Sequence, residues 1–154
     1  MTPLNPELIE LDALIHQLTD FYHELASSLG LSYCAFDILY AVTELGDGCL
    51  QRDICRTMAC PKQTVNSAIK RLVQRDILRM ESGRGREMRI FLTDHGREFM
   101  EERFSAVVHI ENSSYSSFTP EEWAEYIRLT KKHIDVLHRS RKTLSLSNER
   151  SCST

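Results

Sequence analysis

The fold of this 154-residue chain is decided by residues 50–96, which read LQRDICRTMACPKQTVNSAIKRLVQRDILRMESGRGREMRIFLTDHG. An apolar periodicity at its start predicts a short helix, and the segment 59–61 predicts a turn before a second helix over 62–75. Two strands are expected at 77–81 and 88–92, joined by a hairpin tip rich in Arg and Gly. This order of helix, turn, helix and hairpin predicts a winged helix-turn-helix.

The same segment is basic, although the whole chain is acidic. It holds ten Lys and Arg residues against five Asp and Glu, a net charge of +5 in a chain of net charge −3. The first 51 residues contain eight acidic side chains and no Lys or Arg. Because phosphate neutralisation supplies most non-specific nucleic-acid affinity, this distribution predicts one surface that binds double-stranded DNA and a remainder that does not.

The second predicted helix carries polar side chains outside its expected buried stripe of Val65, Ile69, Leu72 and Val73. Hydrogen-bonding side chains recur at three- and four-residue spacing, so they share a helical face that suits base edges in the major groove. Residues at the helix start suit phosphates, and arginines on the hairpin suit the minor groove or its flank. The predicted DNA-binding residues are Lys62, Gln63, Thr64, Asn66, Ser67, Lys70, Arg71, Arg84, Arg86 and Arg89. A polar helix face or a basic hairpin alone is as often plain solvated surface, but the two together favour DNA.

Capping signals place further helices on either side of this segment. Asn5 precedes a long amphipathic helix that ends at Gly30, and Ser32 precedes a second helix that ends at Gly46. Thr93 is expected to cap a helix running towards Ser117, and the capping-box spacing of 119–122 opens a last helix through about His138. The chain is thus predicted to be mainly α, with a small β-hairpin wing. The expected parts are an N-terminal helix over 1–31, the winged lobe over 32–96, C-terminal helices over 97–142 and a disordered tail over 143–154.

Across nearly its whole length the sequence resembles the MarR family of winged-helix transcription regulators. The resemblance rests on the run PKQTVNSAIKRL at 61–72, on the wing sequence GRGR at 83–86, and on LTDHG at 92–96, which matches the family's Leu-Thr-x-x-Gly signature. It implies a homodimer, built through the terminal helices, that binds a pseudo-palindromic operator. Arg86 lies at the spacing of the wing-tip Arg that enters the minor groove. Arg84 stands where the family usually has Asp, and Asp76 stands where a Gly commonly ends the recognition helix.

The resemblance also implies a pocket for a small aromatic effector, and its candidate lining is His16, Tyr22, Tyr33 and Phe36. Aromatic residues at such spacing are more often plain core. Among the five cysteines, Cys34 and Cys60 are candidates for redox sensing, because each lies near the start of a helix whose dipole favours a thiolate. Buried and inert cysteine is the commoner fate.

No cofactor, metal site or catalytic site is predicted. The His and Cys residues show no recognised metal spacing, and no GxSxG, phosphate loop or HExxH motif occurs. No apolar run of about 20 residues and no signal peptide is seen, so a cytoplasmic protein without a membrane partner is expected. The sequence therefore predicts a dimeric, DNA-binding transcription regulator, a repressor released by a small molecule or by thiol oxidation. The alternative is a winged-helix interaction adaptor that does not bind DNA specifically.

Overall fold

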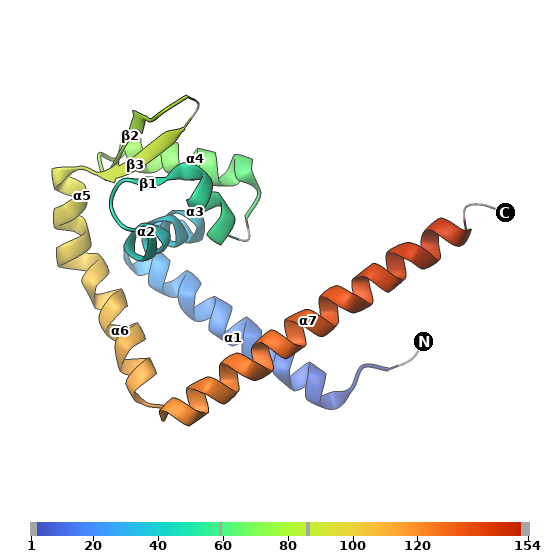
Figure 1. Ribbon diagram of the computed structural model, residues 1–154. Helices are drawn as coiled ribbons and strands as arrows, with labels where there is room; N and C mark the ends of the chain where they lie inside the picture. Colours follow the sequence, from blue (N-terminus) through green and yellow to red (C-terminus); the bar gives the residue numbers. More distant parts are fainter. Residues whose placement is uncertain (1–2, 59, 86, 152–154) are drawn as a thin grey trace. The chain divides into compact units, whose positions relative to one another are not determined.

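The computed structural model describes residues 3–58, 60–85 and 87–151, with side chains through Arg141. The chain divides into two compact units, Met1–Val107 and Val108–Thr154, which are described separately below. The helices are α1 Pro6–Ser28, α2 Tyr33–Leu45, α3 Gln51–Thr57, α4 Lys62–Gln74, α5 Asp94–Phe99, a π-helical turn Met100–Phe104, α6 Ser105–Ser116 and α7 Pro120–Ser151. The strands are β1 Cys49–Leu50, β2 Leu78–Ser82 and β3 Met88–Leu92 (Figure 1). This mainly helical chain with a winged helix-turn-helix has the fold class predicted from the sequence.

The predicted capping residues begin their helices. The Asn5 side chain accepts a hydrogen bond from the backbone N–H of Glu7 at 2.8 Å, and α1 starts at the following Pro6. The Ser32 hydroxyl accepts from the N–H of Ala35 at 3.3 Å at the start of α2. Each side chain satisfies a backbone donor that has no partner within the helix, which is why these residues define the starts.

The core of the first unit lies between α2, α3, α4 and the sheet. Its largest fully buried side chains include Phe36, Ile38, Leu39, Ile54, Ile69 and Leu72. In α4 the buried stripe consists of Val65, Ala68, Ile69 and Leu72. Val73, which the sequence analysis placed in this stripe, is 36% exposed. Positions 65, 68, 69 and 72 follow the i, i+3, i+4, i+7 pattern of one helical face, and position 73 lies beyond its edge.

The wing belongs to a three-stranded antiparallel sheet in the order β1-β3-β2. In the hairpin Leu78 pairs with Leu92 and Ser82 with Met88, so the predicted hairpin is present, with its first strand starting one residue later than expected. The sequence analysis missed β1, in which Cys49 pairs with Ile90. A two-residue strand shows no alternation, and it forms only because β3 offers a free edge to the turn after α2.

The junction between the wing and α5 is tightly packed around Thr93 and Gly96. The Thr93 hydroxyl accepts from the Gly96 N–H at 2.8 Å, as expected for an N-cap, and donates to the Asp76 carbonyl oxygen. Asp76 adopts a left-handed backbone conformation with φ 56°, as expected for a residue that replaces glycine after α4. A Cβ built on Gly96 would meet the carbonyl group of Ile77, whose carbon lies 3.0 Å away and whose oxygen lies nearer still. Position 96 therefore has room only for glycine.

The helix predicted from Thr93 to Ser117 is interrupted by the π-helical turn Met100–Phe104. Phe99 and Phe104 are both buried although they stand five residues apart, a spacing that an α-helix places on different faces. The wider π turn returns both rings to the core, where Phe104 lies 5.4 Å from Phe36 between ring centroids.

In the second unit, α7 begins with the predicted capping box. The Thr119 N–H donates to the Glu122 carboxylate at 2.8 Å, and the Glu122 N–H donates to the Thr119 hydroxyl at 3.2 Å. Trp123 donates through its ring N–H to the Tyr115 carbonyl oxygen at 2.8 Å and stacks on the Tyr115 ring at 5.3 Å. These contacts fix the turn between α6 and α7.

Helix α7 extends to Ser151, beyond the end expected near His138 and through most of the tail expected to be disordered. No Gly or Pro occurs between positions 121 and 151, so the sequence holds no residue that stops a helix once it has begun. Residues 152–154 lie outside the described part of the chain. Among the described residues, no single helix has the length and apolar character to cross a membrane, whereas α1 and α2, bent by 89°, pass that test only when joined.

Candidate nucleic-acid interface

Helix α4 presents its predicted DNA-contacting side chains on the side away from the core. Six of them, Lys62, Gln63, Thr64, Ser67, Lys70 and Arg71, are exposed, and Asn66 is half-buried. The opposite stripe is fully buried, so the helix is held in place by packing while its polar face remains open. This division of faces is the arrangement that a helix needs in order to enter a major groove without unfolding the domain.

The cations on this face are available to a ligand. In the described part of the chain, Lys62, Lys70 and Arg71 take part in none of the ion pairs, whose members lie on other elements. The Ser67 hydroxyl donates to the Gln63 carbonyl oxygen at 2.9 Å, so its proton is used within the helix. Ser67 therefore meets a ligand as a hydrogen-bond acceptor.

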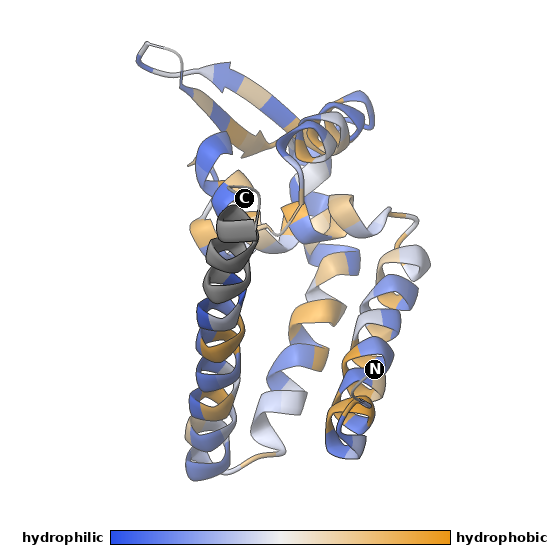
Figure 2. Cartoon of the chain, turned by 90° about the vertical axis from the view of Figure 1, so that its right-hand side faces the viewer, coloured by the Kyte–Doolittle hydropathy of each residue, from blue (hydrophilic) through white to orange (hydrophobic). Residues whose placement is uncertain are grey.

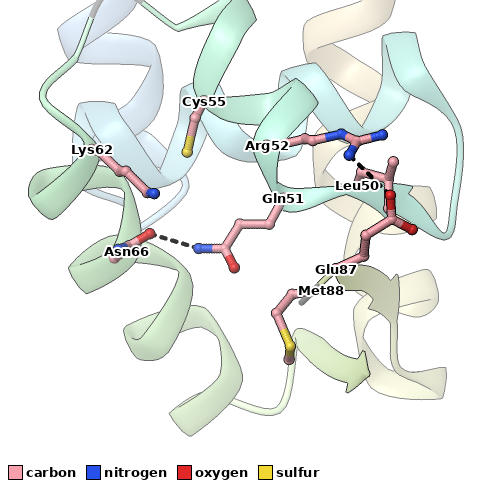
Figure 3. A pocket seen from close by; sticks show the side chains of 8 residues that line it. All are labelled: Leu50, Gln51, Arg52, Cys55, Lys62, Asn66, Glu87 and Met88. Carbon is pink, nitrogen blue, oxygen red and sulfur yellow. Dashed lines mark hydrogen bonds and ion pairs between the residues drawn. The ribbon is translucent and has the colours of Figure 1, made fainter. Parts of the chain in front are cut away.

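A cavity of about 590 Å³ opens between α3, α4 and the wing, and it is lined by Leu50, Gln51, Arg52, Cys55, Lys62, Asn66, Glu87 and Met88 (Figure 3). Within it the Gln51 side-chain amide donates to Asn66 Oδ1 at 2.6 Å. The Arg52 guanidinium pairs with the Glu87 carboxylate at 2.9 Å. The first contact ties α3 to α4, and the second ties α3 to the wing.

Sequence reasoning missed Gln51 and Arg52 as members of this surface. Both stand on α3, for which the sequence analysis considered only the apolar residues that predict a helix. Their one signal in the sequence is that a polar and a basic residue follow Leu50 at the start of a short helix in the basic segment. Their contacts depend on the packing of α3 against α4 and the wing, which the sequence pattern does not specify.

The wing places its arginines in different environments. Arg84 is exposed and takes part in no ion pair with another described residue. Arg89 is exposed, but one guanidinium nitrogen donates to the Gly48 carbonyl oxygen at 3.0 Å, so this side chain also braces the turn before β1. Arg86, the predicted wing-tip residue, lies outside the described residues. The tip itself turns through Gly85, whose φ of 67° is in the left-handed region.

The two candidate redox cysteines lie close together beside α4. Cys34 lines a second cavity of about 400 Å³ together with Ser32, Gln63, Thr64, Ser67, Ala68 and Arg71. Burial, followed by the neighbouring Cys60 thiol and then by the charge of Asp37, raises the pKa of Cys34 to about 11. The expected lowering by the dipole of α2 is thus outweighed, and Cys34 is a protonated thiol at neutral pH.

The four candidate effector residues have different surroundings in the structure. Tyr22 and Phe36 lie near each other, with ring centroids 6.4 Å apart, and Phe36 is 2% exposed as part of the core. Tyr33 stacks instead on His23 at 4.4 Å, and His16 is exposed on α1. The cavity between α3, α4 and the wing and the cavity beside Cys34 are lined by other residues. The described residues also form no cluster of three or more His, Cys, Asp and Glu side chains suited to a metal ion.

Comparison with known proteins agrees with this geometry. The MarR family model matches residues 29–87, which run from the end of α1 to the wing. Residues 29–87, which hold α2, α3, α4 and the first strand of the wing, are therefore similar to the MarR family. No curated protein sequence matches the chain.

Solved structures of MarR regulators share the fold over most of the chain. NMB1585, a MarR family regulator from Neisseria meningitidis, has a TM-score of 0.76 at 19% identity, covering 89% of this chain and 96% of its own. MepR of Staphylococcus aureus, solved as a complex with DNA, has a TM-score of 0.64 at 17% identity, covering 88% and 99%. BpsR of Bordetella bronchiseptica, whose DNA binding is regulated by 6-hydroxynicotinic acid, has a TM-score of 0.60 at 22% identity, covering 80% and 97%. The MarR-type fold therefore extends beyond the matched segment to the terminal helices.

Proposed function

We propose that this MarR-type chain is a sequence-specific DNA-binding transcription regulator that acts as a homodimer on a pseudo-palindromic operator. The observation that carries the proposal is the face of α4, where exposed polar and basic side chains back onto a fully buried stripe. The unpaired cations of α4 and Arg84 of the wing supply positive charge on the same segment, whose net charge is +5. The complex of MepR with DNA is a precedent within the fold.

Exposed apolar side chains on the terminal helices support the homodimer. On α1, Leu8, Ile9, Leu11, Leu14, Ile15 and Leu18 are each 39% to 55% exposed, and on α7, Tyr126, Ile127, Leu129, Ile134, Val136 and Leu137 are 46% to 57% exposed. Figure 2 shows hydrophobic residues recurring along both helices. Apolar surface of this extent is costly in water, and a second copy of the chain is the partner that the fold suggests.

A dimer also provides the geometry for regulation. Two recognition helices must stand about 34 Å apart to enter successive major grooves on one side of the duplex. A small molecule that changes this separation weakens binding at both half-sites together. The proposed role is therefore that of a repressor released by an effector, and the regulation of BpsR by 6-hydroxynicotinic acid makes a small aromatic compound the first class to screen. The proposal involves no cofactor and no catalytic step.

The test is a fluorescence-anisotropy titration of the purified protein against labelled DNA from upstream of its own gene, with scrambled duplex as competitor. A regulator binds saturably and resists the scrambled DNA, whereas an interaction adaptor gives no binding or loses it equally to any duplex. Light scattering at micromolar concentration reports the oligomeric state, and a monomer contradicts the dimer.

Two variants of α4 test whether its polar face is the contact surface. Replacing Arg71 with Ala is expected to weaken binding and to reduce the slope of log K against log salt by about 0.9, the value for one phosphate contact. Gln74→Ala is the matched control, because Gln74 is exposed at the end of the same helix and uncharged. Equal behaviour of the two variants would refute the proposed contact surface.

A further inference from the structure

Two side-chain amides in the cavity between α3, α4 and the wing are joined by a hydrogen bond in which one residue is the donor and the other the acceptor. Gln51 Nε2 donates to Asn66 Oδ1 at 2.6 Å, across 15 residues of sequence. Figure 3 shows the Gln51 nitrogen directed at the Asn66 oxygen, with the Gln51 oxygen turned away from it. Both residues are half-buried, so the bond is partly shielded from competing water.

The orientation of this pair matches the charge around it. Lys62 stands one helical turn before Asn66 on α4 and lines the same cavity, whereas the charge of Arg52 in this cavity is paired with Glu87. A cation favours amide oxygens, rather than N–H groups, on its own side. The N-terminal end of α4 carries positive partial charge, which likewise favours amide oxygens on its side. These charges favour the state in which Asn66 turns its oxygen inward to Gln51 and leaves its amide nitrogen for a ligand.

The engaged oxygen limits what Asn66 can recognise. A free Asn pairs with adenine by accepting from the N6 amino group and donating to N7, which uses both ends of its amide. The Gln51 contact uses one of the two lone pairs of Oδ1 and directs this oxygen towards α3, so the end of the amide on the other side is the Nδ2 donor, which makes no hydrogen bond to another described residue. Guanine presents two acceptors, N7 and O6, on its major-groove edge, whereas adenine presents one acceptor beside a donor.

We propose that Gln51 is a positioning residue that holds Asn66 as a hydrogen-bond donor towards the major groove, and that the base facing Asn66 in each half-site is guanine rather than adenine. The inference rests on the proposed function as a DNA-binding regulator. Gln51 acts through Asn66, and its effect falls on base preference at one position rather than on overall affinity.

The experiment selects binding sites from a randomised duplex pool with four proteins in parallel: the full-length wild type, Asn66→Ala, Gln51→Ala and Gln51→Glu. Preferences are then measured by anisotropy on the selected duplex and on versions that carry each other base at one position. Loss of preference in Asn66→Ala identifies the position that Asn66 contacts. Gln74→Ala serves as the control for an amide removed from an exposed site.

The two changes at Gln51 have different expected results. In Gln51→Ala the Asn66 amide is free to rotate, so the affinity ratio of guanine to adenine at the Asn66 position falls by about tenfold, one good pairwise contact. In Gln51→Glu the carboxylate only accepts, so Asn66 must turn its nitrogen inward and its oxygen outward, and the preference moves to adenine or cytosine, which present donors. The other positions keep their preferences. Because the readout is a ratio, the uniform loss of affinity from the added charge cancels.

The alternative outcomes distinguish a failure of this inference from a failure of the proposed function. If the wild type selects no sequence, the proposed function fails and the inference fails with it. If the wild type selects an operator but the Asn66 position prefers adenine, or if neither Gln51 variant changes the ratio there, the inference is wrong and the regulator stands. The inference is also overturned if Asn66→Ala changes the base preference at no position of the operator. Thermal unfolding of every variant shows which of them fold, and Gln51→Glu, nearly isosteric with the wild type, remains informative if Gln51→Ala does not fold.

Discussion

Replacing Gly96 with Ala tests the packing between the wing and α5 on which the winged helix depends. In an open helix this change stabilises by about 1 kcal/mol, because Ala has the higher helix propensity. At this position the new Cβ would stand 3.0 Å from the Ile77 carbonyl carbon and 3.2 Å from the Thr93 hydroxyl, with the Ile77 oxygen nearer still, whereas ordinary contact begins at 3.4 Å. Since the obstacle is backbone, it cannot rotate away as a side chain does.

Overpacking of this kind costs about 3 kcal/mol when the backbone must shift, the upper end of its usual range. After the gain in helix propensity, the net loss in the free energy of unfolding is about 2 kcal/mol. For a chain of this size that lowers the melting temperature by about 6 °C. The movement of Ile77 also strains the hydrogen bond from Thr93 N to the Ile77 oxygen, recorded at 3.1 Å.

The assay is thermal and urea unfolding followed by circular dichroism at one fixed protein concentration, because the stability of a dimer depends on concentration. His95→Ala is the matched control, since His95 is the exposed neighbour of Gly96 on the same helix. The control is expected to lie within about 0.5 kcal/mol of the wild type. A Gly96→Ala protein as stable as the wild type, or more stable, would refute the reasoning from the Ile77 contact.

Three further predictions follow from single contacts. Glu87→Gln frees Arg52 from its 2.9 Å ion pair, so DNA affinity is expected to rise and the salt slope in anisotropy to steepen by about 0.9; an unchanged slope would contradict a phosphate contact by Arg52. Thr119→Ala removes one arm of the capping box and is expected to cost about 1 kcal/mol, measured as faster amide exchange at Glu122; unchanged exchange would show that the box contributes nothing. Burial raises the pKa of Cys34 from 9.0 to about 11, so its alkylation rate, followed by mass spectrometry, should stay low at pH 8 and rise towards pH 11. Because the folded pKa is the higher one, the protonated thiol stabilises the fold below pH 9 and loses this effect as the pH rises to about 11; rapid alkylation at pH 7 would contradict the raised value.

Most of the helices could be predicted because their signals are local. A capping side chain such as Ser32 meets a backbone donor three residues away, and an apolar stripe depends only on the helical repeat. The same local chemistry predicted the capping box before α7. The polar face of α4 followed from the same repeat, and six of the seven contact residues predicted on this helix are exposed.

The differences between the predicted and the observed structure arise where segments that are distant in the sequence meet. The strand at Cys49 exists because Ile90 lies beside it, and the π-helical turn exists because the Phe104 ring must reach Phe36. The pKa of Cys34 follows from its burial beside Cys60, which outweighs a helix dipole visible in the sequence. In each case a tertiary contact overrides a local preference.

The amino-acid sequence by itself determined the winged helix-turn-helix, its basic surface and the polar face of α4, because periodicity, capping and charge are properties of neighbouring residues. Only the tertiary structure decided how that surface is organised. It joined Gln51 to Asn66 and Arg52 to Glu87, pairs that are far apart in the chain and meet only when α3 packs against α4 and the wing. The direction of a hydrogen bond depends on the positions of both partners in space, and a linear pattern holds no record of those positions.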